Sequence, residues 1–282
     1  MQAEIKEVVI VGAGPAGVSA AVQLKRWGLD PCLIDKKTKA GGLIENAYSV
    51  QNYPGLEQPL NGIILSERMN DFLKSNKIKI LNGQVQLVEK KDDLYLVHLE
   101  GSVLFCKNLV FAVGTRPKTP SENDLKLIKR DRVFYEVAPI LRDYNLHNKK
   151  VLIVGGGEAS LDYALSLSDV MKEIVIIIRG SFCRSNQILK KEVESRKNIK
   201  ILYKKTLQDV INEQNFDSVF FAIGRESILS EIKLNFDISV EKNVFVVGDA
   251  KTGSLGQIGI AVGDGLNVAR RICENCIQHT RE

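Results

Sequence analysis

The chain has 282 residues, of which 44% are hydrophobic and 26% charged, with a formal net charge of +5 and five cysteines. This length suits one large domain or two modest ones, and the composition is that of a globular protein rather than a disordered one. No apolar run is long enough to cross a bilayer, and the scattered Lys and Arg residues do not indicate a nucleic-acid partner. The start of the chain lacks the features of a signal peptide, so we expect a cytoplasmic protein with mostly free thiols.

The first predicted element is a buried parallel strand over Val8–Val11, which leads into the glycine turn Gly12-x-Gly14-x-x-Gly17. A helical pattern and a second strand ending at Asp35 follow, and this is the full context of a dinucleotide-binding motif. The glycines allow a tight turn, a close approach of a pyrophosphate and close helix packing, while the acid reaches ribose hydroxyls. The residues assigned to this site are Gly12, Gly14, Pro15, Ala16, Gly17, Asp35 and Lys36.

The same pattern recurs over residues 149–180, where a strand leads into Gly155-x-Gly157 and Ser160 stands at the third position. Its second strand, IVIII, ends in Arg179 rather than an acid. An Arg at this place favours the 2′-phosphate of NADP over NAD, although a solvated strand end is the alternative. The residues assigned to this second, NAD(P) site are Gly155, Gly157, Glu158, Ala159, Ser160, Arg179, Arg184 and Gly224.

Other short motifs follow one another along the chain: GGLIENAYSVQNYPG at 41–55, FAVGTRP at 111–117, FAIGRE at 221–226 and FVVGDA at 245–250. Because these motifs follow one another in this order together with the two glycine turns, the chain resembles the thioredoxin reductase-like flavoproteins. These are the low-molecular-weight pyridine nucleotide-disulfide oxidoreductases. The resemblance implies an α/β fold of two Rossmann-like nucleotide-binding domains, the second inserted into the first. Residues 1–116 and 245–282 would form the FAD-binding domain and residues 117–244 a shortened NAD(P)-binding-like domain. It also implies a homodimer.

The resemblance further implies roles around FAD. Gly41 and Gly42 would let the backbone lie against the flavin ring, and Asp249 would hold the ribityl chain. Gln257 would open a final helix whose amides face the ring. Asn52 is either a ligand or a plain turn residue. The other FAD residues implied are Leu43, Val85, Gly114, Thr115, Gly248 and Ile258.

The chain departs from the family in the segment before its second glycine turn. Thioredoxin reductases carry a C-x-x-C there, whereas residues 132–157 contain no cysteine. In this respect the chain is more similar to the ferredoxin-NADP reductases built on the same fold. The β-hairpin layer that flanks the nucleotide domain also looks trimmed, with only pieces such as NIKILYKK and NFDSVFFAIG remaining.

A C-x-x-C does occur near the end of the chain, at Cys273 and Cys276. On a helix from Gln257, Cys273 would lie about 24 Å from the flavin end, too far for direct transfer, but the helix end would leave both thiols accessible. Three interpretations remain: inert thiols, a surface disulfide or metal clip, and a redox pair that reaches a flavin across a dimer or through motion. Cys32, Cys106 and Cys183 look structural.

The leading functional hypothesis is an enzyme in which FAD relays electrons between NADPH or NADH and a small carrier such as ferredoxin or flavodoxin. Hydride transfer needs no side-chain acid or base, so no catalytic residue and no metal site are assigned. The basic stretch Lys126, Lys129, Arg130 and Arg132 would either receive an acidic carrier or be a solvated face. The alternatives are a thioredoxin-type disulfide reductase that uses Cys273 and Cys276, and a flavin-binding redox protein that does not use nicotinamide.

Overall fold

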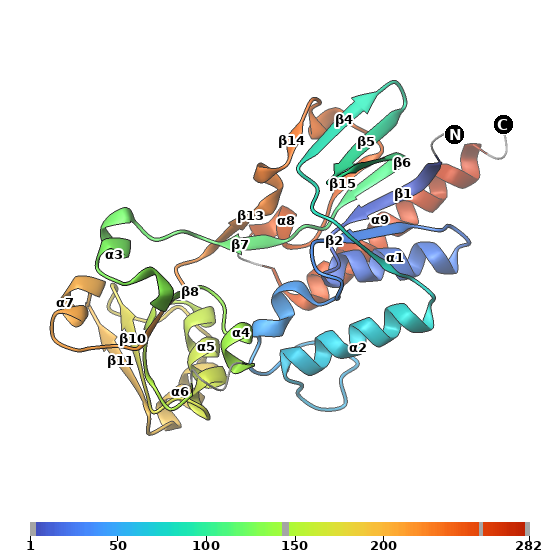
Figure 1. The fold of residues 1–282 in the computed structure, drawn as a ribbon. Coiled ribbons are helices and arrows are strands. Elements are labelled where there is room, and N and C mark those ends of the chain that lie inside the picture. The colour runs from blue at the N-terminus through green and yellow to red at the C-terminus, as the bar shows by residue number, and fades with distance from the viewer. Residues whose placement is uncertain (1–3, 143–146, 254–255, 280–282) are drawn as a thin grey trace.

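The computed structural model describes residues 4–142, 147–253 and 256–279, so both ends of the expected first domain extend beyond the described residues. It contains two α/β units joined by two extended strands, β7 and β13 (Figure 1). Each unit has a core of parallel strands with helices packed on it. The predicted fold class, two Rossmann-like domains, is confirmed.

The first unit is built on a sheet in the order β14-β4-β5-β6-β1-β2-β3, with β15 also paired to β6. Strands β2, β1, β6 and β15 are mutually parallel, whereas β4, β5 and β6 form an antiparallel meander. The strand bounds are β1 (Ile5–Val11), β2 (Cys32–Asp35), β3 (Ile80–Asn82), β4 (Leu87–Lys91), β5 (Leu94–Leu99), β6 (Ser102–Phe111), β14 (Lys233–Leu234) and β15 (Val244–Val246).

The apolar run of β1 is continuous because both faces of this sheet are covered. Val8 and Ile10 face the core formed with helices α1 (Pro15–Arg26) and α9 (Ile258–His279), which lie side by side (Figure 1). Val9 and Val11 face a second core on the other side. This alternation with a period of two is what a strand buried on both faces requires.

The second unit is a five-stranded sheet in the order β11-β10-β9-β12-β8, in which every pair is parallel. The segments expected as remnants of a hairpin layer instead supply β11 and β12, two strands of this main sheet. The strands are β8 (Val133–Phe134), β9 (Lys150–Val154), β10 (Glu173–Ile178), β11 (Ile199–Tyr203) and β12 (Ser218–Phe221). The helices are α3 (Glu122–Lys126), α4 (Ala138–Leu141), α5 (Glu158–Ser168), α6 (Gln187–Ser195) and α7 (Leu207–Ile211).

The two crossings between the units run side by side, because β7 (Thr115–Pro117) pairs antiparallel with β13 (Arg225–Ser227). The expected domain bounds placed these crossings at residues 116–117 and 244–245. After β13 the chain enters η4 (Ile228–Glu231), and β14 then pairs with β4 of the first sheet. Leu229, Ile232 and Leu234 pack into the core of the first unit. The expected end of the inserted unit at residue 244 is therefore corrected to the region of β13.

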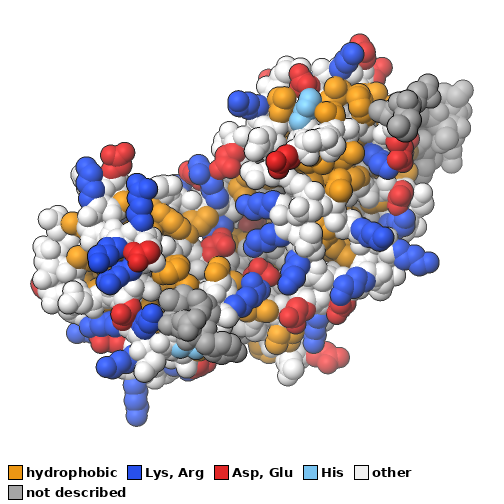
Figure 2. Space-filling view, in the orientation of Figure 1, with side chains coloured by type: hydrophobic (Ala, Val, Ile, Leu, Met, Phe, Trp, Pro, Cys, Tyr) orange, Lys and Arg blue, Asp and Glu red, His pale blue; other side chains and the backbone are white. Residues whose placement is uncertain are grey.

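The remaining described elements are α2 (Gly62–Ser75), α8 (Asp249–Thr252), η1 (Gly42–Asn46), η2 (Arg130–Arg132) and η5 (Ile238–Val240). None of the helices within the described ranges is both long and apolar enough to span a membrane. On the face shown in Figure 2, Lys and Arg side chains are spread over both units and interspersed with Asp and Glu.

Candidate functional site

The main cavity lies where parallel strands of the first sheet end. Its walls follow the carboxyl ends of β1, β2, β6 and β15, the edge at which such sheets bind ligands. It therefore brings together the two ends of the chain. The sequence-predicted residues that line it are Gly12, Gly14, Pro15, Ala16, Asp35, Lys36, Gly42, Leu43, Gly114, Thr115, Gly248, Asp249, Gln257 and Ile258.

The first glycine turn forms one wall, and its three glycines have different surroundings. Gly12 has a φ of +109°, and a Cβ there would lie 2.3 Å from the carbonyl oxygen of Ala112, so only glycine fits. A Cβ at Gly17 would lie 1.8 Å from the carbonyl oxygen of Gly12, which explains the close packing of α1 on β1. At Gly14 a Cβ would meet no atom within 4 Å. This open position adjoins the first turn of α1, where no side chain caps the helix and no acidic residue stands, so its amides can receive an anion.

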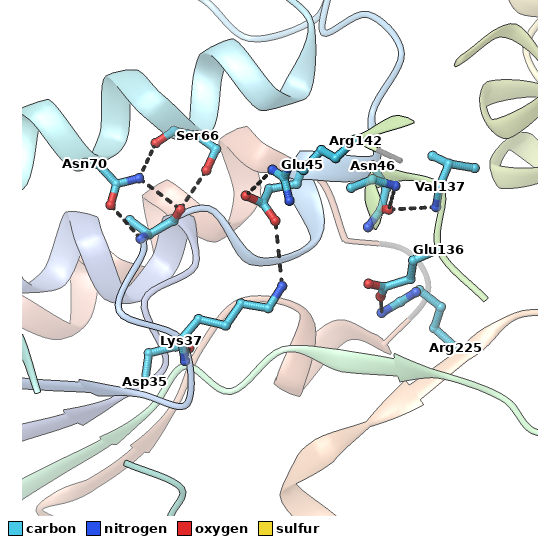
Figure 3. A network of polar contacts seen from close by, with 12 residues as sticks. Asp35, Lys37, Glu45, Asn46, Ser66, Asn70, Glu136, Val137, Arg142 and Arg225 are labelled. Atoms are coloured by element: carbon cyan, nitrogen blue, oxygen red, sulfur yellow. Dashed lines mark hydrogen bonds and ion pairs between the residues drawn. The ribbon is translucent and has the colours of Figure 1, made fainter. Parts of the chain in front are cut away.

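Asp35, at the end of β2, also faces the cavity. Its carboxylate accepts hydrogen bonds from the backbone N–H groups of Ala13 and Lys37, each at 2.8 Å. The side chain therefore fixes the glycine turn against the loop that follows β2. The Nζ of Lys37 lies 3.6 Å from Glu45, whose other oxygen accepts a hydrogen bond from Arg142 of the second unit at 3.0 Å (Figure 3).

Asp249 also lines the cavity, from the first turn of α8. Its carboxylate is so close to Gly256 that a Cβ there would lie 1.8 Å from its Oδ1. Burial raises the pKa of Asp249, and the nearby Arg225 guanidinium opposes that shift. The cavity thus offers helix amides near the first turn and a carboxylate near α8.

Among the cavity residues that the sequence analysis missed are Glu136, between β8 and α4, and Arg225, on β13. Arg225 donates to the hydroxyl of Thr115 at 3.0 Å, to the carbonyl of Thr115 at 2.8 Å and to Glu136 at 3.3 Å. Two sequence features could have pointed to these residues. Glu136 lies in the segment that lacks the family's C-x-x-C, and Arg225 lies in the FAIGRE motif.

A polar contact between the two units holds the second unit beside this cavity. The amide oxygen of Asn46 accepts hydrogen bonds from the backbone N–H groups of Val137 and Ala138 at 3.0 and 3.1 Å (Figure 3). The backbone N–H of Tyr48 donates to Asp162 at 3.1 Å, and burial raises the pKa of Asp162 to about 6. Sequence reasoning missed these residues as well, since each is an isolated polar side chain.

Four sequence-predicted FAD residues do not line the cavity: Gly17, Gly41, Asn52 and Val85. Gly41 packs on α2, where a Cβ would lie 2.1 Å from the hydroxyl of Ser66. Asn52 is exposed in its turn, and Val85 is buried in the core of the first sheet.

The second glycine turn repeats the geometry of the first. A Cβ at Gly155 would lie 2.3 Å from the carbonyl oxygen of Ala222, as Gly12 lies against Ala112. Ser160 is fully buried, and its hydroxyl donates to the carbonyl of Gly157 at 2.6 Å, so a serine fits where the first turn has Gly17. The further NAD(P) candidates Glu158, Ala159, Arg179, Arg184 and Gly224 are exposed.

Arg184 adjoins this second turn, because its backbone N–H donates to the carbonyl of Gly156 at 2.8 Å. The second turn does not line the main cavity, so the structure places the two nucleotide turns at separate sites.

The C-terminal cysteines differ from the expectation of accessible thiols. Cys273 is 4% exposed and packs in the core with α1, and Cys276 packs against the same core. Burial raises the pKa of Cys273 to about 11 and also raises that of Cys276. The apolar face of α9 packs on this core as far as Cys276. Among the described residues, no group of three or more His, Cys, Asp or Glu side chains is placed to hold a metal.

Comparison with known proteins agrees with the two glycine turns and the cavity between the chain ends. A family model described as pyridine nucleotide-disulphide oxidoreductase matches residues 6–267. The chain belongs to this family. The resemblance read from the motifs is thereby confirmed, and the chain is a thioredoxin reductase-like member of an NAD(P)H-dependent flavoenzyme family.

Relatives of this oxidoreductase family match over most of the chain. Thioredoxin reductase of Mycoplasma genitalium is 26% identical, covering 95% of this chain and 94% of the relative. The 34.2 kDa protein in the rubredoxin operon of Clostridium pasteurianum is 25% identical over 96% and 97%. Crystal structures of thioredoxin reductases from Lactococcus lactis (FR conformation) and T. acidophilum share the fold. Their TM-scores are 0.81 and 0.82 at 22% and 24% identity, and each covers 97% of this chain and 99% of that structure.

Proposed function

We propose that this oxidoreductase binds FAD in the main cavity and passes electrons from NAD(P)H, with NADPH preferred, to a small one-electron carrier such as ferredoxin or flavodoxin. The observation that carries the proposal is the cavity itself, which joins the Gly12–Ala16 turn to Gly248–Asp249 and to the start of α9. When bound there, FAD would supply hydride acceptance from nicotinamide and release of single electrons.

The residues of the cavity fit such a group. The open space at Gly14 and the uncapped first turn of α1 suit a pyrophosphate. Asp249, on α8, suits a hydroxylated chain, because its carboxylate accepts hydrogen bonds. We accordingly propose the cavity-lining residues as FAD contacts, residues 4–114 with 228–279 as the FAD domain, and residues 118–224 as the nicotinamide-nucleotide domain.

The preference for NADPH rests on Arg179 and Arg184. Both are exposed, and Arg184 adjoins the second glycine turn through its backbone. A guanidinium can bind a 2′-phosphate with two parallel hydrogen bonds, which NADH cannot match.

The choice of a one-electron carrier rests on the cysteines. Within the described residues, the cavity lining contains no cysteine, and Cys273 is buried in the core along α9. A flavin that has no dithiol beside it suits acceptors of single electrons. The relative from the rubredoxin operon supports a small redox protein as partner. The alternative use of Cys273 and Cys276 as a disulfide centre is not favoured, because their thiols are protonated and poorly accessible.

From the family resemblance, we also propose that the protein is a homodimer and that it lies in the cytoplasm. Sedimentation of the purified protein tests the first. The acceptor is tested by reducing the protein with NADPH under anaerobic conditions and adding ferredoxin, flavodoxin or oxidised thioredoxin in turn. Rapid reoxidation by ferredoxin or flavodoxin supports the proposal, whereas reoxidation by thioredoxin alone would replace it with disulfide reduction.

A further inference from the structure

The most distinctive polar group in the cavity is the ion pair of Glu136, from the second unit, and Arg225, from the joining strand β13. Glu136 Oε1 lies 3.3 Å from Arg225 Nη2. The two side chains are 33% and 15% exposed, less than those of the Arg116–Glu226 pair between β7 and β13, at 46% and 42%. Both residues line the cavity together with Gly114, Thr115 and Asp249, and Figure 3 shows the ion pair itself.

Both partners are fixed in place by other contacts. Arg225 is held by two hydrogen bonds to Thr115, from the neighbouring strand β7. Glu136 immediately precedes Val137 and Ala138, whose amides are held by the buried Asn46. The cavity therefore contains one fixed negative charge and one fixed positive charge that the proposed hydride transfer does not use.

We propose that the Glu136–Arg225 pair sets the reduction potential of the bound flavin, with Glu136 lowering it and Arg225 raising it. This inference rests on the proposed function, because it requires FAD in the cavity. On reduction the flavin gains a hydride, that is two electrons and one proton, and NAD(P)H becomes NAD(P)+. The flavin then carries added negative charge, which a fixed carboxylate disfavours and a fixed guanidinium stabilises.

Other ionisable groups also face the pair. Asp249 and Tyr163 face it from α8 and α5, and Asp35, Lys36, Lys37 and Lys39 line the same cavity. Burial raises the pKa of Tyr163 to about 12, so its hydroxyl stays neutral at ordinary pH. Because the charge of Arg225 also lowers the pKa of Asp249, replacement of Glu136 is the more direct test of the pair.

The test is the midpoint potential of the FAD-loaded protein, measured against a reference dye. Glu136→Gln keeps the shape of the side chain and removes its charge. We expect it to shift the equilibrium toward reduced flavin about tenfold, a rise of about 30 mV for a two-electron couple. Arg225→Gln should shift the equilibrium in the opposite direction by a similar factor.

The matched control is the pair of Arg116 on β7 and Glu226 on β13, which lies 2.8 Å apart but outside the cavity lining, with side chains 46% and 42% exposed. Arg116→Gln and Glu226→Gln should each change the equilibrium less than threefold. If Arg225→Gln does not fold, Arg225→Lys, which keeps the charge, replaces it and should leave the potential near that of the wild type.

An unchanged potential in Glu136→Gln would overturn the inference, as would shifts of the same sign in Glu136→Gln and Arg225→Gln. Either result would leave the proposed function standing, provided that the protein still binds FAD and is reduced by NAD(P)H. A wild-type protein that does not bind FAD would overturn both.

Discussion

The amide oxygen of Asn46 accepts a hydrogen bond from the backbone N–H of Val137 at 3.0 Å, although Asn46 belongs to the first unit and Val137 to the second. Asn46 is 4% exposed, and it accepts a second hydrogen bond from Ala138 at 3.1 Å. This contact holds the segment that carries Glu136 at the cavity. The buried amide side chain of Asn46 thus supports the arrangement of the two units at the site, together with the contact of Tyr48 with Asp162.

Asn46→Ala removes this acceptor from two amides at the interface. We expect the free energy of unfolding to fall by about 1–3 kcal/mol, because buried N–H groups lose their partner. Urea unfolding followed by circular dichroism measures the change. Asn123→Ala, at an exposed position on α3, is the control and should leave the midpoint unchanged. Equal midpoints for both variants would contradict this account of the interface.

Replacement by alanine should weaken FAD binding at Gly14 but lower the stability of the fold at Gly17. A Cβ at Gly14 meets open space, so Gly14→Ala should fold normally but bind FAD at least tenfold more weakly. A Cβ at Gly17 would collide with the carbonyl of Gly12, so Gly17→Ala should lose about 3 kcal/mol or more of folding free energy. Flavin fluorescence and urea unfolding separate the two effects. Gly263→Ala, on α9 with no atom within 4 Å of its Cβ, is the control. Unaltered FAD affinity in Gly14→Ala would count against the cavity as the FAD site.

Asp162 should make stability depend on pH. Burial raises the pKa of its carboxyl from 3.8 to about 6 in the folded protein, so between these values the folded state binds more protons than the unfolded state. Its contribution to stability is therefore complete below pH 4 and is lost as the pH rises through about 6, by about 2–3 kcal/mol. Asp162→Asn keeps an acceptor for Tyr48 and cannot titrate. The variant should gain stability over the wild type between pH 4 and pH 7, measured by urea unfolding. A constant difference across this range would refute the assignment.

The thiol of Cys273 should react slowly in the native protein. With a pKa of about 11 and 4% exposure, it holds little thiolate at pH 8 and is poorly accessible. Iodoacetamide labelling followed by peptide mass spectrometry should modify Cys273 at least a hundredfold faster after unfolding than before. Cys273→Ser should also destabilise the protein by about 1–3 kcal/mol, because it buries a hydroxyl in an apolar core. Rapid labelling of native Cys273 would revive the hypothesis of a redox pair.

Features with a local cause could be predicted from the sequence. The two glycine turns were visible because each is a short local pattern of glycines between a predicted strand and a predicted helix, although the atom that excludes a side chain at Gly12 belongs to the distant Ala112. Gly12 and Asp249 line the same cavity although most of the chain separates them in sequence. We expected this only from the order of the motifs that carry the family resemblance.

Features that depend on distant contacts could not be predicted. Glu136, Arg225 and Asn46 form no local pattern, and their roles come from partners about 90 residues away or more. The return to the first sheet was placed too late because β14 has only two residues, too few for a periodic pattern. Cys273 was expected at an open helix end, but the apolar face of α9, with Ala269 and Ile272, stays buried as far as this residue.

The most direct test of the central claim is an anaerobic titration of the purified protein, followed by its absorbance near 450 nm. We expect a yellow protein with one FAD per chain, which NADPH bleaches completely and NADH bleaches more slowly. A protein that stays colourless after incubation with FAD would contradict the assignment of the cavity. A yellow protein that neither nucleotide bleaches would contradict the proposed use of nicotinamide.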